Sequence, residues 1–133
     1  MKYCTDTWFL LKAFDKDAKA VQIIEDTKQG KTQLVIPTVV FAETIKKLAQ
    51  RRVSQETIFK FFSAVEQSEK VSLTILDRKI AKEASLISLS NKVPLIDAFV
   101  AASAKLSDCL VLLSGDDDYK LLVKKKYIKV QSW

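Results

Sequence analysis

Short apolar runs alternate with helical patterns along the whole of this chain, and that alternation is typical of parallel βαβ units. Its 133 residues match the size of one domain, and only two glycines and two prolines occur, which favours long helices over tight turns. The pattern predicts a single α/β domain over residues 1–133, with a central parallel sheet of about five strands in a three-layer α/β/α arrangement. The expected strands are Lys2–Thr5, Gln33–Ile36, Val71–Leu76, Cys109–Leu113 and Ile128–Gln131.

Helical spacing of apolar residues fills the gaps between the predicted strands. Ser54 is a candidate N-cap, and the apolar residues after it from Ile58 to Val65 follow the period of a helix. The other expected helices lie around Val21 and Ile24, from a Thr38 cap toward Gln50, from Asp77 through Ile87, from Pro94 through Ala104, and near Tyr119 to Val123.

The chain contains no histidine, and this absence restricts its chemistry. Ser-His-Asp and Cys-His catalysis are excluded in their usual forms, as are the common zinc sites that combine His with Cys. Any bound metal would have oxygen ligands, which favours a hard cation such as Mg²⁺, Mn²⁺ or Ca²⁺.

The net charge of +6 permits a polyanionic partner without requiring one. No apolar run is long enough to span a membrane, and the start of the chain places Asp6 where a signal peptide needs an apolar core. Cys4 and Cys109 lie in apolar stretches and are expected to be free thiols. These features predict a cytoplasmic protein.

Five carboxylates are expected at the carboxyl end of the sheet, where doubly wound folds bind their ligands. They follow a strand or lie in an early helical turn, at Asp6, Glu43, Asp97, Asp116 and Asp118. Each alone has a plain explanation as a helix cap, a partner of a helix dipole or part of a solvated turn. Together they would repel one another, and a cation that neutralises them is the usual reason for such a cluster.

At these positions the chain resembles the PIN-domain family, which includes the VapC-type toxins of toxin–antitoxin systems, and the resemblance covers essentially the whole chain. The family's four motifs correspond here to Tyr3-Cys4-Thr5-Asp6-Thr7, Ile36-Pro37-Thr38-Val39-Val40-Phe41-Ala42-Glu43, Pro94-Leu95-Ile96-Asp97-Ala98-Phe99-Val100-Ala101-Ala102 and Ser114-Gly115-Asp116-Asp117-Asp118-Tyr119. Trp8 stands where many members carry a small polar residue, and Ser114 replaces a commoner Thr while keeping the hydroxyl. Asp77 has the same strand-to-helix position as Asp6 but lies outside the motifs, so it is expected only to cap a helix.

The resemblance implies a Mg²⁺- or Mn²⁺-dependent endoribonuclease that hydrolyses RNA phosphodiester bonds and leaves 5′-phosphate and 3′-hydroxyl ends. It implies that Asp6, Glu43, Asp97, Asp116 and Asp118 are the catalytic carboxylates. Asp6, Asp97 and Asp116 would be the metal ligands, and Thr7 and Ser114 would orient them from outside the coordination shell. Lys12, Lys46, Lys47 and Arg51 are candidates for contact with the RNA backbone.

The resemblance also implies partners. The chain would be the toxin of a toxin–antitoxin pair and would bind an antitoxin protein. A homodimer is expected because family members usually pair, and because Phe59, Phe61 and Phe62 cannot all point into the core of one copy.

Three other functions compete with this interpretation. A receiver-like signalling module would accept phosphate on Asp77, but receivers carry paired acids after the first strand and a Lys after the fifth. A non-catalytic PIN fold used for RNA binding or assembly would not need every motif acid. A haloacid-dehalogenase-type phosphatase would need Asp-x-Asp after the first strand, and position 8 here is Trp.

Overall fold

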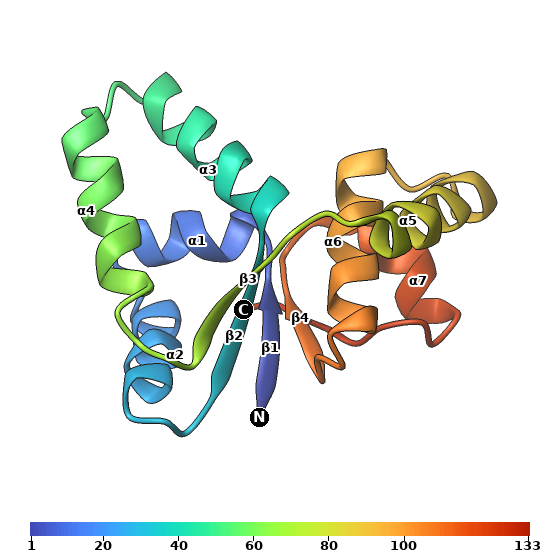
Figure 1. Cartoon of the computed structure of the whole chain (residues 1–133), viewed down its shortest axis with the longest axis horizontal. Coiled ribbons are helices and arrows are strands. Elements are labelled where there is room, and N and C mark those ends of the chain that lie inside the picture. The colour runs from blue at the N-terminus through green and yellow to red at the C-terminus, as the bar shows by residue number, and fades with distance from the viewer.

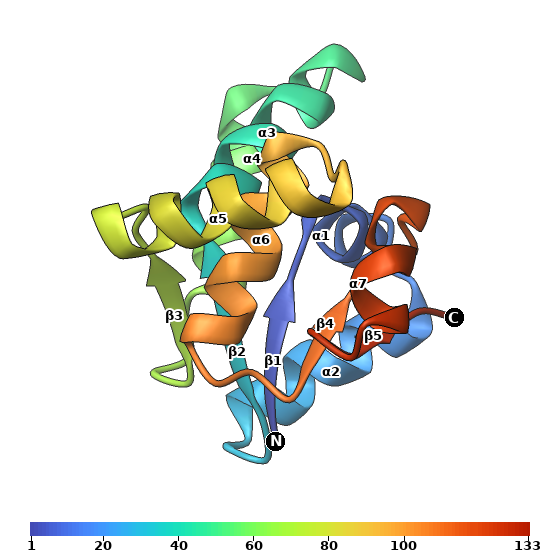
Figure 2. The same cartoon turned by 90° about the vertical axis from the view of Figure 1, so that its right-hand side faces the viewer.

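The computed structural model describes residues 1–133 and contains one sheet of five parallel strands in the order β3-β2-β1-β4-β5. The three-layer α/β/α prediction is confirmed (Figures 1 and 2). The strands are β1 (Lys2–Thr5), β2 (Gln33–Pro37), β3 (Val71–Thr74), β4 (Val111–Leu113) and β5 (Val130–Gln131).

Three strands are shorter than the sequence predicts, and strand pairing gives the reason in two cases. β3 pairs only with β2, and its last partner is Pro37, so the strand ends at Thr74 rather than at Leu76. β5 pairs only with the last two residues of β4, so it holds Val130 and Gln131 alone. β4 begins at Val111 rather than at Cys109.

Helices cover both faces of the sheet. In Figure 1, α1 (Thr7–Phe14), α2 (Ala18–Lys28) and α4 (Gln55–Val65) lie on one side, while α5 (Arg78–Asn91), α6 (Leu95–Leu106) and α7 (Lys120–Lys124) lie on the other. α3 (Thr38–Gln50) projects beyond the carboxyl end of β2, and the 3₁₀ helix η1 (Asp117–Tyr119) leads into α7. None of these helices combines the length and the apolar character needed to cross a membrane.

The helix ends confirm some predicted caps and correct others. The Ser54 hydroxyl accepts a hydrogen bond from the Thr57 amide at 3.2 Å, and Asp77 accepts one from the Ile80 amide at 2.8 Å, as the sequence predicts. The expected Thr38 cap is wrong, because Thr38 is already helical and Pro37 occupies the N-cap position without a side-chain hydrogen bond. Pro37 has φ −61°, which suits the turn from strand into helix.

The first connection contains two helices where apolar spacing predicts one around Val21 and Ile24. Asp6 caps α1, and the helix ends where Lys16 adopts a left-handed backbone with φ 60°. Asp17 then caps α2 by accepting a hydrogen bond from the Ala20 amide at 3.1 Å. The α1 segment is apolar almost all round, so its helical period is hard to detect in the sequence.

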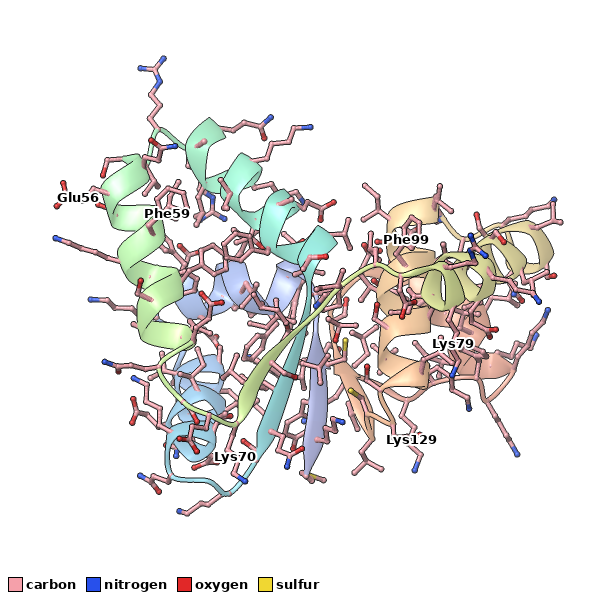
Figure 3. All side chains as sticks on the ribbon, viewed as in Figure 1. Glu56, Phe59, Lys70, Lys79, Phe99 and Lys129 are labelled. Carbon is pink, nitrogen blue, oxygen red and sulfur yellow. The ribbon has the colours of Figure 1, made fainter.

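The three phenylalanines of α4 differ in their environments. Phe62 is buried with its ring centroid 4.3 Å from that of Phe41, and Phe61 packs against Phe14 at 5.4 Å. Phe59 is 45% exposed and is labelled in Figure 3. One copy of the chain therefore packs two of the three rings, Phe61 and Phe62. Only Phe59 is left exposed, so these three residues do not form an exposed apolar face.

The strand order places a topological switch point between β1 and β4. From β1 the chain runs outward through β2 to β3, then crosses to β4 on the other side of β1 and continues to β5. In open α/β sheets, ligands bind outside the carboxyl ends of the strands at such a point. Asp6 follows β1 and Ser114 follows β4, so both lie at this position.

Candidate active site

Asp6 is the most deeply buried acid of the site, with only 6% of its surface exposed. As the N-cap of α1, it accepts a hydrogen bond from the Phe9 amide on Oδ1 at 3.3 Å, while Ser114 Oγ donates to Oδ2. Burial raises the pKa of Asp6 to about 6, although both hydrogen bonds favour the charged form and oppose this shift. Asp6 is therefore held rigidly, at a cost in desolvation that a nearby cation would offset.

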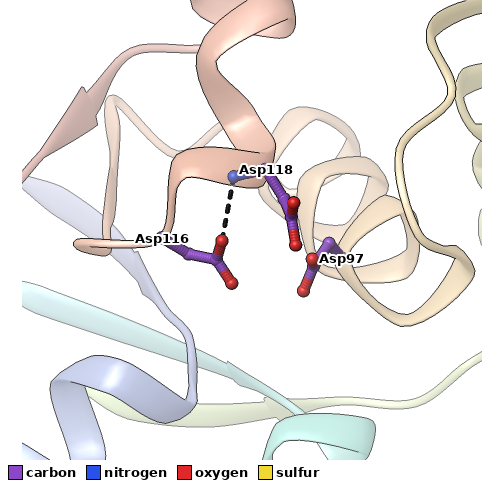
Figure 4. A group of neighbouring side chains, drawn as sticks. All are labelled: Asp97, Asp116 and Asp118. Atoms are coloured by element: carbon purple, nitrogen blue, oxygen red, sulfur yellow. Dashed lines mark hydrogen bonds between the residues drawn. The ribbon is translucent and has the colours of Figure 1, made fainter.

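The loop after β4 is organised by its own side chains. The buried Ser114 hydroxyl accepts a hydrogen bond from the Asp116 amide at 3.0 Å. Asp116 in turn caps η1 by accepting from the Asp118 amide at 2.8 Å, the bond drawn in Figure 4. Ser114 thus connects this loop to Asp6, and the loop positions two further carboxylates.

Three carboxylates form the tightest acidic group in the molecule. One oxygen from each of Asp97, Asp116 and Asp118 lies within 4.8 Å of the others, and Figure 4 shows Asp97 of α6 facing the two acids of the loop. Burial raises the pKa of Asp97 to about 7, and the hydrogen bond with Asp118 and the charges of Asp116, Asp118 and Asp6 add to the shift. Near neutral pH Asp97 is therefore partly protonated, and a divalent cation would displace that proton.

A cleft of about 310 Å³ opens over these acids. Four of the five predicted carboxylates line it, namely Asp6, Glu43, Asp97 and Asp116. Asp118 is not part of the lining and borders the site through its contacts with Asp97 and Asp116. The remaining lining residues are Thr7, Trp8, Leu11, Lys47, Ile96, Val100 and Tyr119.

The three carboxylates expected as metal ligands and the three that lie closest together differ by one residue. The family resemblance implies Asp6, Asp97 and Asp116 as ligands, whereas the closest three carboxylates are those of Asp97, Asp116 and Asp118. Asp6 is held back by Ser114 and the Phe9 amide, but its charge still contributes to the raised pKa of Asp97. The charges of Asp6, Asp116 and Asp118 thus all act on Asp97.

The predicted RNA-contacting residues lie in different settings. Lys47 lines the cleft and forms an ion pair with Glu43 at 3.9 Å, and Lys46 lies in an adjoining hollow that also includes Glu43 and Ile96. Lys12 lies over the Trp8 ring, 5.0 Å from its centroid, and is 3.8 Å from Asp17. Arg51 makes two hydrogen bonds to Asp15, at 3.0 and 3.1 Å, and does not line the cleft.

Tyr119 is a site residue that the sequence does not predict. It is 1% exposed, it lines the cleft, and its hydroxyl has no hydrogen-bond partner. Burial raises its pKa well above the ordinary value, and the charges of Asp6 and Asp97 raise it further, so the hydroxyl stays protonated. The aromatic position that ends the fourth motif is the sequence signal for this residue.

The donor set of the site fits a hard cation. Every candidate ligand is a carboxylate oxygen, and the chain has no histidine, while its two free cysteines lie outside the cleft lining. Asp77, the acceptor in the receiver interpretation, instead lies beside β3 in a separate hollow with Lys79 and Ile80. Asp6, directly after β1, and Asp77, the N-cap of α5, therefore lie in separate sites.

Comparisons with known proteins agree with this fold. The sequence profile of the PIN domain matches residues 3–125. VapBC2 from Rickettsia felis, solved bound to a DNA fragment from its promoter, has a similar structure with a TM-score of 0.75 and 13% identity, covering 100% of this chain and 99% of that one. A toxin–antitoxin complex from Klebsiella pneumoniae has a TM-score of 0.67 at 19% identity, covering 88% of this chain and 89% of that one. VapC20 of Mycobacterium tuberculosis, a toxin that cleaves the sarcin–ricin loop, has a TM-score of 0.69 at 16% identity, covering 90% and 94%. No curated protein matches the sequence significantly.

Proposed function

The chain belongs to the PIN-domain family, and from this premise we propose that it is a Mg²⁺- or Mn²⁺-dependent endoribonuclease and the toxin of a toxin–antitoxin pair. The observation that carries the proposal is the convergence of Asp97, Asp116 and Asp118 within 4.8 Å, beside a cleft that Asp6 and Glu43 also line. Carboxylates this close favour a bound cation, and an all-oxygen set favours a hard one.

In this proposal Asp6, Asp97 and Asp116 hold the ion, and Asp118 adds negative charge at its edge. A bound Mg²⁺ or Mn²⁺ supplies activation of the attacking water and neutralisation of the phosphate oxygens. Ser114 keeps Asp6 and the Asp116 loop in fixed positions, as the hydrogen bonds to both indicate. Thr7 lines the cleft at the start of α1 and orients groups around the ligands.

Glu43 and Lys47 have complementary roles in the proposed hydrolysis. Glu43 reaches the cleft from α3, a different element from those that carry the aspartates, and is available to accept the proton of the attacking water. Lys47, 3.9 Å from Glu43, offers its ammonium group to a phosphate oxygen of the RNA. With Lys46 beside it, Lys47 offsets the repulsion between an acidic cleft and a polyanion.

The partners of the chain are part of the proposal. Two of the similar structures are toxin–antitoxin assemblies by name, which supports an antitoxin protein as a partner. We also propose a homodimer, for which the exposed apolar side chains Leu86, Leu89, Leu95 and Ile96 of α5 and α6 are the best surface. Light scattering of the purified chain tests the dimer, and a monomer at high concentration contradicts it.

Both cysteines are free, which supports the cytoplasm as the compartment of the protein.

RNA cleavage by the purified chain tests the enzymatic proposal. Incubation with RNA in Mg²⁺ or Mn²⁺ should give products with 5′-phosphate ends, and EDTA should stop the reaction. RNA binding should weaken as salt rises, because contacts with phosphates release counterions. Cleavage that continues undiminished in EDTA would rule out the metal-dependent mechanism.

A further inference from the structure

Trp8 forms one wall of the cleft that contains the candidate catalytic carboxylates. It lies in the first turn of α1, two residues after Asp6, and its side chain is only partly buried. An indole ring at this place lies beside the phosphate that the proposed function puts over the aspartates. The groups that flank a phosphate in RNA are its sugars and nucleobases, and a nucleobase is the one that matches a flat aromatic surface.

The Trp8 ring rests directly on the backbone of Gly115. A Cβ atom added at Gly115 would lie 2.4 Å from Trp8 Nε1 and 2.6 Å from Cε2, closer than real atoms approach. Gly30 is the only glycine with a positive φ, so the backbone at position 115 does not itself require glycine. The missing side chain at Gly115 is explained by the space that the indole occupies.

Two further contacts hold the ring and provide positive charge beside it. Trp133 packs edge-on against Trp8 with 5.0 Å between ring centroids, and the Trp133 indole N–H donates a hydrogen bond to Asp17 at 2.8 Å. The Lys12 ammonium group lies over the Trp8 ring, 5.0 Å from its centroid, and a base that stacks on this face would take the place of that flexible side chain. An aromatic surface beside a lysine is the combination that single-stranded nucleic-acid sites use, with the ring for a base and the cation for the backbone.

We propose that Trp8, seated on Gly115, is the stacking surface for an unpaired nucleobase next to the scissile phosphate of the RNA. The inference rests on the proposed function, since it takes the phosphate position from the carboxylate site. Trp8 thereby selects substrate, and Gly115 acts as a positioning residue through Trp8. A base inside a duplex is already stacked on its neighbours, so this surface favours an unpaired strand.

Intrinsic fluorescence tests the contact without depending on cleavage. In the Trp133→Phe variant, Trp8 is the only tryptophan, and adding Asp97→Asn keeps the RNA intact. Titration with a short single-stranded oligoadenylate in Mg²⁺ should quench Trp8 emission to saturation, whereas the matching duplex should not. Saturable binding of the strand without any change in Trp8 emission would overturn the proposal.

Kinetics of the chain with its wild-type carboxylates provide the second test. Trp8→Leu should raise KM for a single-stranded substrate about 5- to 150-fold, the range expected for one lost base stack, with kcat nearly unchanged. Trp8→Phe should restore most of the affinity, because it keeps an aromatic face. A loss in kcat at unchanged KM would instead assign Trp8 to packing alone and overturn the proposal.

Gly115→Ala offers a route to the same result that leaves Trp8 in the sequence. The added methyl group must displace the indole, so KM should rise as in Trp8→Leu. If Gly115 acts through Trp8, the double variant should have the KM of Trp8→Leu alone. Fully additive losses would show that the two residues act independently and would overturn the positioning role.

Tyr127→Leu is the matched control. Tyr127 lies before β5, in a hollow at the amino ends of the strands, and Lys105 lies 5.3 Å from its ring centroid, much as Lys12 lies over Trp8. Lys129, in the same hollow, is labelled near the lower end of the sheet in Figure 3. Removing this second aromatic–lysine pair should leave KM unchanged.

The outcomes separate this inference from the proposed function. Stacking on Trp8 without metal-dependent cleavage by the wild-type chain would overturn the proposed enzymatic function and keep only the base-stacking role of Trp8. Metal-dependent cleavage with equal KM values for the wild type and Trp8→Leu would overturn the inference and keep the enzyme.

Discussion

Ser114, directly after β4, donates a hydrogen bond to Asp6, directly after β1, and so connects two segments that lie 108 residues apart at the switch point of the sheet. The same hydroxyl accepts from the Asp116 amide at 3.0 Å. A single side chain thus fixes Asp6 and Asp116 relative to one another. The parallel pairing of β1 with β4 makes this contact possible, because it brings the carboxyl ends of both strands together.

Replacing Ser114 with Ala should raise the pKa of Asp6 above its wild-type value of about 6, because the hydrogen bond from Ser114 favours the charged carboxylate. The Asp116 amide also loses its acceptor, and the free energy of unfolding should fall by about 1–3 kcal/mol. Carboxyl resonances followed by NMR titration give the pKa. Ser114→Thr keeps the hydroxyl and should leave the pKa close to that of the wild type, and an unchanged pKa in Ser114→Ala contradicts the assigned contact.

The stability of the metal-free protein should fall as pH rises from about 4 to about 7. Unfolded aspartates titrate near pH 3.9, whereas folded Asp6 and Asp97 titrate at about 6 and about 7. Across that interval the folded state keeps protons that the unfolded state has released, so each rise in pH favours unfolding. Urea denaturation of the wild type and of Asp97→Asn isolates the contribution of Asp97. A wild-type curve with the same pH slope as the variant contradicts the raised pKa.

Mg²⁺ or Mn²⁺ should release protons on binding near neutral pH and should stabilise the folded chain. The physical reason is that the cation takes the place of the proton on Asp97 and relieves the repulsion from Asp116 and Asp118. Calorimetry in buffers of different ionisation enthalpy measures the released protons. Binding without proton release would show that Asp97 is already charged.

Much of the fold follows from local patterns that the sequence displays. Ser54 and Asp77 were predicted as caps because a short polar side chain before a periodic apolar run can accept the free amides of a first turn, and both do so. The break between α1 and α2 was not predicted, because it depends on a left-handed Lys16, a conformation that the sequence does not signal. The end of β3 was also not predicted, because it depends on the partner strand β2, whereas both ends of β1 match the prediction.

The candidate site likewise has residues that the sequence predicts and contacts that only the structure reveals. Asp6 and Asp116 follow the neighbouring parallel strands β1 and β4, so strand position alone predicts that they meet at one edge of the sheet. Asp97 lies in the first turn of α6, and its place in the site, like the distinction between Asp6 and Asp77, is predicted by the family resemblance. The contact between Trp8 and Gly115 joins residues far apart in the chain, and no local pattern reveals it. The absence of a hydrogen-bond partner for Tyr119 is likewise a property of the packed structure alone.

Tyr119→Phe should increase the free energy of unfolding of the metal-free protein by about 1 kcal/mol. The hydroxyl is buried without a hydrogen-bond partner, so its removal relieves a desolvation cost while the ring keeps its packing. Thermal and urea denaturation in EDTA measure the change. A loss of stability would show that the hydroxyl has a partner in the folded protein.

The most direct test of the catalytic site compares RNA cleavage by Asp97→Asn and Asp77→Asn in Mg²⁺ or Mn²⁺. Both residues are aspartates near the start of a helix, but Asp97 belongs to the carboxylate group and Asp77 only caps α5. Asp97→Asn should lose more cleavage activity than the roughly 10- to 100-fold that the loss of an outer-shell partner costs a metal site, and should fold at least as well as the wild type. Asp77→Asn should keep the wild-type rate, because asparagine also caps helices. Cleavage by Asp97→Asn at the wild-type rate would contradict the assignment of this site.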